Sequence, residues 1–496
     1  MNDTLAANDT ALTLIDLQAI RDWLATPPAP QAEDELAPLH AHLTALGEAR
    51  ASAELCHTVL DQLHDRTQAT WQRLQPQLIG VILPLSRRIR HTVRGLQGVL
   101  LALAESYLRL PEQALAALGI PAEQITWRAL NALALHLQIS NYVAAPYGVG
   151  IWKLAHQTFR TALARDHAER HIPGADGTVA DLYLRACLLA CAQPASFTSR
   201  EIGLAVDYIR RFASRAAFLA GDRLKEAEGV FWIDPDRDAP PTSAARRPAP
   251  EGALCFACER LAQLAEEQID ALEAGASVAD LDLPDAAVSP AGHGVLRRLA
   301  HHWGHPGKRR FPRRRQNYRA ELHIGLAALC QLYGNEPASA GETTHWLVTN
   351  ESPDGYAVMH TAGKTGRLVA GDIVAISTEQ HRDWQVCIVR WALSENPEHL
   401  ELGLQILSRQ ALPALLAIPG ANTEAAPRQV LVLPALPPIR PHETLVASTG
   451  TVGSCGQHMI LMSERQNLEI REIRTTRLEE QTANIEVAAF EPALAG

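Results

Sequence analysis

Two groups of side chains in the second half of the chain have the types and the spacing that ligand recognition requires. One is a block of arginines between residues 308 and 319, and the other is the segment Asn350-Glu351-Ser352-Pro353-Asp354-Gly355. A guanidinium donates paired hydrogen bonds to a phosphate or to the O6 and N7 acceptors of guanine. The Asn and Ser side chains can reach a base or a phosphate, and Gly355 permits a positive φ and a close backbone approach.

The arginine block contains the spacing Arg-x-x-x-Arg three times, so the residues alone leave the gripping pair open. The pair Arg315 and Arg319 stands directly before the apolar run 322–326, which predicts a strand, and we favour this pair. Arg309, Arg310, Arg313 and Arg314 are the alternative arginines. Two arginines four residues apart at the mouth of a strand can hold one ligand together.

The order of arginine pair, strand, Asn-x-Ser-x-x-Gly and further strands resembles the PilZ family of cyclic di-GMP receptors. That family carries R-x-x-x-R followed by [D/N]-x-S-x-x-G, and the segments 371–374, 389–391 and 402–405 are similar to strands of its small β-barrel. The resemblance implies that cyclic di-GMP binds at Arg315, Arg319, Asn350, Ser352 and Gly355. Some barrels of this family have lost the ligand, so a ligand-free interaction scaffold is the alternative.

Length and composition describe a soluble multidomain protein. The chain has 496 residues, 47% apolar and 20% charged, with a net charge of -10, which predicts about three domains. Residues 286–320 contain nine Lys or Arg and no Asp or Glu. An anionic partner is therefore expected there. Nucleic-acid binding through 297–319 is a second alternative, disfavoured because the chain is acidic and the stretch holds few aromatic residues.

Hydrophobic periodicity predicts an all-α N-terminal array and a β-rich C-terminal extension, and the resemblance implies a PilZ-like antiparallel β-barrel between them. The expected divisions are a helical region, for which a tetratricopeptide-type array is one candidate, a linker rich in Pro and Asp, a helical connector, the barrel and the extension. Their bounds are 1–232, 233–252, 253–302, 303–410 and 411–496. The extension either continues the first barrel or forms a second one. The helical region is expected to contact a protein partner.

Signals for catalysis, metal binding and membrane insertion are weak. One Cys-x-x-Cys, Cys255 to Cys258, lies in a helical pattern without a second pair, which favours reduced thiols over a zinc site. The N-terminus lacks the features of a signal peptide, and the apolar stretch 96–108 is too short to span a bilayer. We expect a cytoplasmic bacterial signalling protein that is not an enzyme and has no cofactor beyond its nucleotide ligand.

Overall fold

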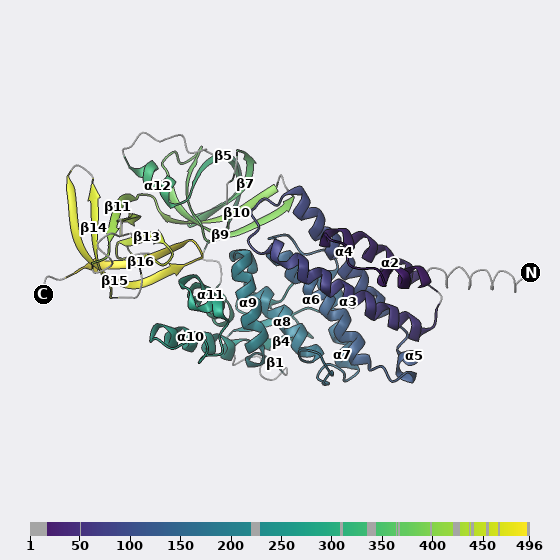
Figure 1. Ribbon diagram of the computed structural model, residues 1–496. Helices are drawn as coiled ribbons and strands as arrows, with labels where there is room; N and C mark the ends of the chain where they lie inside the picture. The colour runs from purple at the N-terminus through teal and green to yellow at the C-terminus, as the bar shows by residue number, and fades with distance from the viewer. Residues whose placement is uncertain are drawn as a thin grey trace, which may run out of the picture. The chain divides into compact units, whose positions relative to one another are not determined.

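Helices fill the first part of the chain and two β-barrels follow, in the order that the sequence predicts (Figure 1). The computed structural model describes residues 17–49, 51–219, 229–307, 311–334, 344–363, 365, 368–396, 399–419, 427–435, 437, 441–452, 456–464 and 467–493. Contacts divide the chain into a helical unit, residues 1–81, 85–191 and 212–259, and a barrel unit, residues 82–84, 192–211 and 260–496. We describe each unit by itself.

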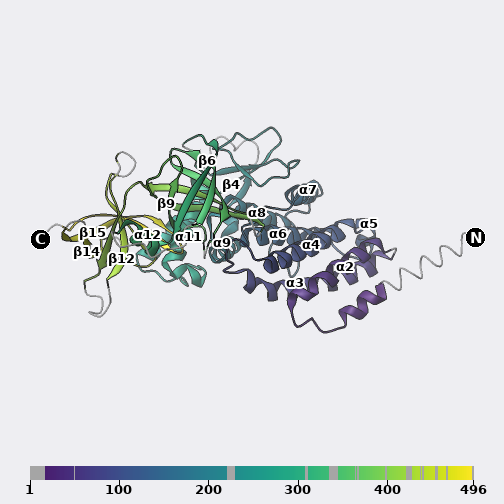
Figure 2. The ribbon, with the colours of Figure 1, turned by 90° about the horizontal axis from the view of Figure 1, so that it is seen from above.

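The helical unit is built from amphipathic helices. After a helix at residues 17–24 come η1 (Ala32–Glu35), α2 (Leu36–Glu48), α3 (Ala53–Leu78), α4 (Arg87–Arg109), α5 (Glu112–Ala117), α6 (Ala122–Tyr142), α7 (Ile151–Ala164) and α8 (Val179–Cys191). The hydroxyls of Ser52 and Ser86 cap α3 and α4 by accepting a backbone N–H three residues later, each at 3.3 Å. Helix α4 packs against α2, α3 and α6, and α2, α3 and α4 lie side by side in Figure 2. Among the described residues, no helix is both long and apolar enough to cross a membrane.

A small antiparallel sheet completes the helical unit and was not expected from the sequence. Its strands are β1 (Ala217–Leu219), β2 (Val230–Ile233), β3 (Thr242–Ser243) and β4 (Leu254–Ala257), in the order β1-β4-β2-β3. Residues 233–252, for which we expected a linker, contain β3 and contact α7. There, Asp238 accepts a hydrogen bond from the N–H of Lys153 at 3.1 Å, and the carbonyl of Ala239 lies 2.9 Å from His156 Nε2.

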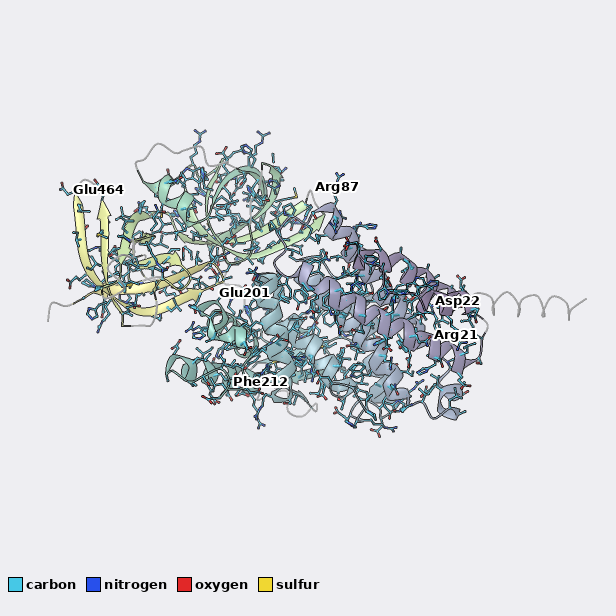
Figure 3. All side chains as sticks on the ribbon, viewed as in Figure 1. Arg21, Asp22, Arg87, Glu201, Phe212 and Glu464 are labelled. Carbon is cyan, nitrogen blue, oxygen red and sulfur yellow. The ribbon has the colours of Figure 1, made fainter. Side chains whose placement is uncertain are left out.

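The barrel unit opens with helices that pack around one tryptophan. They are η2 (Pro194–Ser196), α9 (Ser199–Phe212), α10 (Glu259–Glu273), η4 (Asp285–Val288) and α11 (Pro290–Gly304). Trp303 of α11 is fully buried and stacks on Tyr208 of α9, with ring centroids 6.0 Å apart. Glu201 of α9, labelled in Figure 3, accepts a hydrogen bond from Arg298 of α11. This pair fastens α11 to α9.

Six strands close the first barrel in the order β10-β7-β6-β5-β8-β9. They are β5 (Arg314–Ile324), β6 (Thr344–Ser352), β7 (Gly355–Ala362), β8 (Ile373–Thr378), β9 (Gln385–Asn396) and β10 (His399–Ser408). Helix α12 (Leu326–Tyr333) follows β5. The first strand begins at Arg314 and contains Arg315 and Arg319, so it starts earlier than the run 322–326 for which the sequence predicts a strand.

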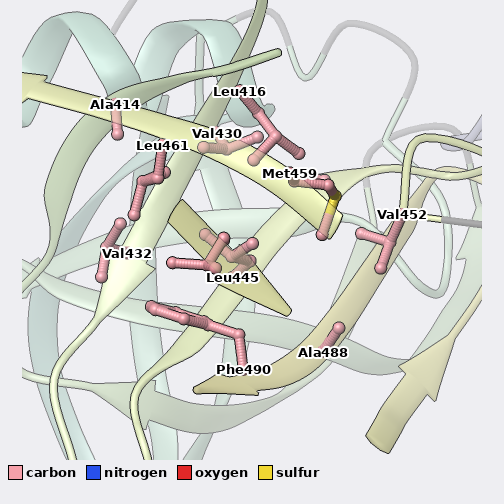
Figure 4. Close-up of a cluster of buried hydrophobic side chains, with 12 residues drawn as sticks. Ala414, Leu416, Val430, Val432, Leu445, Val452, Met459, Leu461, Ala488 and Phe490 are labelled. Atoms are coloured by element: carbon pink, nitrogen blue, oxygen red, sulfur yellow. The ribbon is translucent and has the colours of Figure 1, made fainter. Parts of the chain in front are cut away.

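The C-terminal extension is a second closed barrel, which decides the alternative that the sequence left open. Its strands are β11 (Leu412–Ala417), β12 (Arg428–Leu433), β13 (Thr444–Ser448), β14 (His458–Glu464), β15 (Leu468–Gln481) and β16 (Ile485–Pro492), in the order β11-β12-β13-β16-β15-β14. Leu445, Met459, Leu461 and Phe490 are among the side chains of its buried interior (Figure 4). The predicted fold class, helical array then PilZ-like barrel then β-rich C-terminus, is confirmed.

A second apolar cluster joins the two barrels. Leu329 and Cys330 of α12 pack with outward-facing residues of β8 and β9 and with residues of β12, β13 and β16, namely Ile373, Ala375, Val386, Ile388, Leu431, Leu433, Val446, Ile485 and Val487. We call this set the inter-barrel cluster. Beside it, Asn484 Nδ2 donates to Asp372 Oδ1 at 2.5 Å, and the hydroxyl of Thr482 donates to the carbonyl of Gly371 at 2.9 Å. The two barrels are thus packed into one body.

Candidate functional site

The Asn-x-Ser-x-x-Gly segment forms the turn between β6 and β7. Ser352 pairs with Gly355 across the turn, and the Ser352 hydroxyl lies 2.6 Å from Asp354 Oδ1 and 3.2 Å from the carbonyl oxygen of Gly355. The hydroxyl thus lies within hydrogen-bond distance of two acceptors of its own turn. Ser352 therefore both closes the turn and lies at the edge of the site.

Gly355 is needed because of a close backbone contact. A Cβ at this position would lie 2.0 Å from the carbonyl oxygen of Leu404 on β10, well inside van der Waals contact. Its φ lies outside the left-handed region, so the positive φ that the sequence allowed is not used. The close approach, which the sequence also allowed, is the reason for glycine here.

A cavity of about 200 Å³ opens beside this turn. Phe311 and Arg313 line it from the segment before β5, and Arg390 and Trp391 line it from β9. The remaining lining residues are Asn350, Glu351, Ser352, Asp354, Gly355, Tyr356, Gly403, Leu404 and Gln405. We call this the turn cavity. It combines guanidinium donors, an amide, a hydroxyl and an indole, which are the groups that hold phosphates and flat bases.

The predicted arginines lie at different distances from the turn. Arg315 stands directly opposite Asn350 in the β5–β6 pairing, so the two side chains share one face of the sheet, whereas Arg319 stands opposite Leu347. A register shift between Arg315 and Tyr318 separates them. Arg314 pairs with Glu351, and Arg309 and Arg310 lie outside the described residues. Among the described arginines of the block, Arg313 lines the turn cavity with Asn350 and Ser352.

Tyr318, Tyr356 and Glu351 lie at or beside the turn cavity. The hydroxyl of Tyr318 donates to Glu351 Oε2 at 2.9 Å, and Gln316 donates to the same oxygen at 3.1 Å. Burial, reinforced by the Glu351 carboxylate, raises the pKa of Tyr318 above its usual range, and burial raises the pKa of Tyr356 to about 12. Both hydroxyls are therefore neutral donors near pH 7. Among the residues described, no group of three or more His, Cys, Asp or Glu is placed to hold a metal ion.

Two family models and one known protein are similar to this chain. The model of the N-terminal domain of the cyclic-di-GMP receptor FimW matches residues 18–222, and the model of the middle PilZ domain of that receptor matches residues 331–413. The cyclic-di-GMP receptor FimW of Pseudomonas aeruginosa is 20% identical over 404 residues, 64% of each chain. The chain belongs to the PilZ-domain family of cyclic di-GMP receptors.

The PilZ match confirms the resemblance that the sequence carried, and it falls on the first barrel. It contains Asn350, Ser352 and Gly355 but begins after the arginine block, so the choice among the arginines stays a prediction. The aligned part is just under two thirds of the length of the FimW receptor. Members of this family are named as binding proteins, in keeping with the expectation of a receptor.

Sequence reasoning used Arg390, Trp391 and Gln405 of the PilZ barrel only as signs of strands, and missed that they line the site. The indole of Trp391 crosses Gly403 of the neighbouring strand so closely that a Cβ there would lie 1.8 Å from Trp391 Nε1. A Trp that pairs with a Gly on the neighbouring strand indicates that the Trp ring lies over the Gly, once the strand pairing is known. Without the pairing register of β9 and β10, however, the two residues cannot be matched from sequence.

Proposed function

We propose that this chain is a receptor that binds cyclic di-GMP at the turn cavity and passes its occupancy to a protein partner through the helical unit. The observation that carries the binding proposal is the convergence of Arg313, Asn350, Ser352 and Trp391 on one cavity. Guanidinium and amide groups match phosphates and guanine edges, and an indole offers a stacking surface for a base.

The size of the turn cavity supports the proposal that different arginines contact different parts of the ligand. About 200 Å³ is smaller than the ~300–1,000 Å³ typical of pockets that enclose a whole ligand. One part of the dinucleotide is therefore expected inside the cavity, with the remainder over the exposed side chains of Arg315 and Arg319 on β5. The pair Arg315 and Arg319 remains our proposed motif, and Arg313, four residues after Arg309, is the competing assignment.

Calorimetric titration of the full chain with cyclic di-GMP tests the binding proposal. We expect roughly micromolar affinity, about -8 kcal/mol. Replacing a gripping arginine by alanine should remove more than about 1 kcal/mol of that affinity. The variants are Arg313→Ala, Arg315→Ala and Arg319→Ala, with Arg382→Ala as the control, because Arg382 is an exposed arginine of the same barrel that does not line the turn cavity.

The outcomes separate the assignments. A large loss with Arg313→Ala and none with Arg319→Ala would move the motif to Arg309 and Arg313. No heat and no thermal shift with the wild-type chain would instead favour the ligand-free scaffold.

Nucleic-acid binding through 297–319 has less support. Arg297 and Arg298 of that segment are bonded to Glu273 and Glu201, and the Arg298 side chain is only 14% exposed. A pairing of this kind lowers the charge that the segment offers to a phosphate backbone. Retention of mixed-sequence RNA at physiological salt, read by gel shift, would revive that alternative.

Transmission to a partner is tested by capture with the immobilised full chain, with and without cyclic di-GMP. Two features support it: the helical unit is a compact body of its own, and it matches the N-terminal domain of the FimW receptor. We expect a bound protein whose amount changes with nucleotide in the wild type and not in the arginine variant that fails to bind. Capture that ignores nucleotide in both would count against transmission.

A further inference from the structure

Arg390 occupies an irregular position in the PilZ barrel. In the pairing of β9 with β10, Trp391 faces Gly403 and Val389 faces Leu404, so Arg390 is an extra residue with no opposite number. This is a β-bulge, and bulges turn a side chain away from the direction that regular alternation would give it. The bulge places Arg390 at the turn cavity while its neighbour Val389 stays fully buried.

The guanidinium of Arg390 is bonded on two sides. Its Nε donates to Gln405 Oε1 at 2.6 Å, and its Nη1 donates to Glu480 Oε2 on β15 of the second barrel, also at 2.6 Å. Glu480 follows a bulge as well, because Leu478 faces Ala488 and Glu480 faces Val487, which leaves Glu479 as the extra residue. Irregularities on both strands thus bring this ion pair together.

Arg390 also stands between two cavities. Besides the turn cavity it lines a larger one, of about 730 Å³, whose walls come from α11, β9 and β15. Trp391 and Gln405 line both cavities too. The Arg390 side chain is 36% exposed and that of Glu480 is 16% exposed. A phosphate bound in the turn cavity would therefore contact a guanidinium that is already paired with a negatively charged group, the Glu480 carboxylate.

The bonding of the guanidinium implies a competition. A two-point grip on a phosphate or on guanine uses two neighbouring nitrogens, either Nε with Nη2 or Nη1 with Nη2. Nε has a single hydrogen, which Gln405 accepts, whereas Nη1 keeps a second hydrogen beside the one that Glu480 accepts. A grip by Nη1 and Nη2 therefore places the ligand and the Glu480 carboxylate on the same nitrogen. An anionic ligand repels the Glu480 carboxylate and not the neutral Gln405, so the contact with Glu480 is the one that the ligand weakens.

We propose that cyclic di-GMP and Glu480 compete for the guanidinium of Arg390, so that nucleotide binding to the PilZ barrel loosens strand β15 of the second barrel. The proposal rests on the proposed function, since it assigns Arg390 as a further nucleotide contact and Glu480 as the residue that regulates it. Linkage makes the effect reciprocal, because whatever weakens the ion pair strengthens nucleotide binding by the same factor.

Helix α11 contacts strand β15 directly, so a loosening of β15 would affect α11. Gln481, next to Glu480, accepts a hydrogen bond from Arg297 of α11 at 2.6 Å. Gly294 of α11 lies so close that a Cβ there would come within 2.3 Å of the carbonyl oxygen of Gln481. Because Gln481 is bonded to Glu480 through one peptide unit, a movement of Glu480 displaces a residue that contacts α11. Ligand binding in the turn cavity would therefore change the packing of α11 against β15.

Calorimetry on the full chain tests the competition. Glu480→Gln should tighten cyclic di-GMP binding about fivefold or more, and Arg390→Gln should weaken it by at least as much. In the Arg390→Gln background, Glu480→Gln should change the affinity less than about twofold, because the competitor then has nothing to compete for. Glu479→Gln is the matched control: it removes a neighbouring charge that pairs with Arg477 rather than with Arg390.

Hydrogen exchange supplies a second readout. Amides of residues 477–482 should exchange faster when cyclic di-GMP is bound to the wild-type chain, and Glu480→Gln should show this faster exchange without ligand.

The two failures can be told apart. If the wild type binds no nucleotide, the proposed function fails. If it binds and Glu480→Gln leaves the affinity unchanged or lowers it, or residues 477–482 are unaffected by ligand, the competition is wrong and the receptor function stands.

Discussion

The two barrels have the same strand number and closure but differ in where their pairing is irregular. In the PilZ barrel, register shifts interrupt β5–β6, β6–β7 and β9–β10, which are the strand pairs around the turn cavity. In the second barrel, among the described pairings, shifts occur in β15–β16, the pair that carries Glu480. Each shift redirects a side chain, so the irregular pairs of the first barrel shape the turn cavity, and the irregular pair of the second barrel lies where Glu480 meets Arg390.

The inter-barrel cluster gives the largest test of this comparison. Leu431→Ala removes a fully buried side chain from the cluster, while Leu445→Ala removes one from the interior of the second barrel. Each should cost about 2–5 kcal/mol of unfolding free energy. Native-state hydrogen exchange should show Leu431→Ala lowering protection in β8 and β9 as well as β12. Loss confined to the second barrel would mean that the barrels are energetically separate.

Asp372 provides a pH-dependent test of how the two barrels are joined, because its carboxylate accepts a hydrogen bond from Asn484 of the second barrel. Burial raises its pKa to about 6, against 3.8 for the free group. A raised pKa favours the protonated carboxyl in the folded state, so ionisation costs stability. The cost is absent below about pH 4 and reaches about 3 kcal/mol above pH 6.

The measurement compares the wild type with Asp372→Asn by chemical denaturation across this range. As pH falls from about 7 to 4, the wild type should gain about 3 kcal/mol relative to the variant. A difference that does not change with pH would show that Asp372 keeps an ordinary pKa.

Gly355 gives the smallest expected change in stability and the most local one. Gly355→Ala must displace the Leu404 carbonyl, which should cost about 1–3 kcal/mol and distort the turn cavity. Thermal unfolding and titration with cyclic di-GMP should both register it. Gly307→Ala is the control, because a Cβ there meets no heavy atom within 4 Å. Unchanged binding in Gly355→Ala would place the ligand away from the turn.

Much of the first barrel was predictable because its signals are local. The arginine block lies next to or within β5, the Asn350 turn joins two consecutive strands, and a turn motif reports its own geometry. The second barrel had a readable signal too, since residues 430–433 are apolar at successive positions. Val430 and Val432 fill its interior, while Leu431 and Leu433 belong to the inter-barrel cluster. Such a run predicts a strand buried on both faces.

Other features were beyond sequence because they depend on distant pairings. Arg390 and Glu480 are 90 positions apart, and each is aimed by a bulge that no local pattern marks. The small sheet of the helical unit was missed because its strands are only two to four residues long, too short to show a period. The segment 233–252 has a linker composition, yet Asp238 and Ala239 bond to α7, a tertiary effect that outweighs composition.

The inter-barrel cluster has a consequence for how the protein can be divided. Likeness to the PilZ model ends at residue 413, where a boundary would naturally be drawn. A fragment that ends there would expose Ile373, Ala375, Val386 and Ile388. Such an exposed apolar patch promotes aggregation. The end of sequence similarity is thus not a place of structural independence. The second barrel covers an apolar face of the first and belongs to the same folding unit.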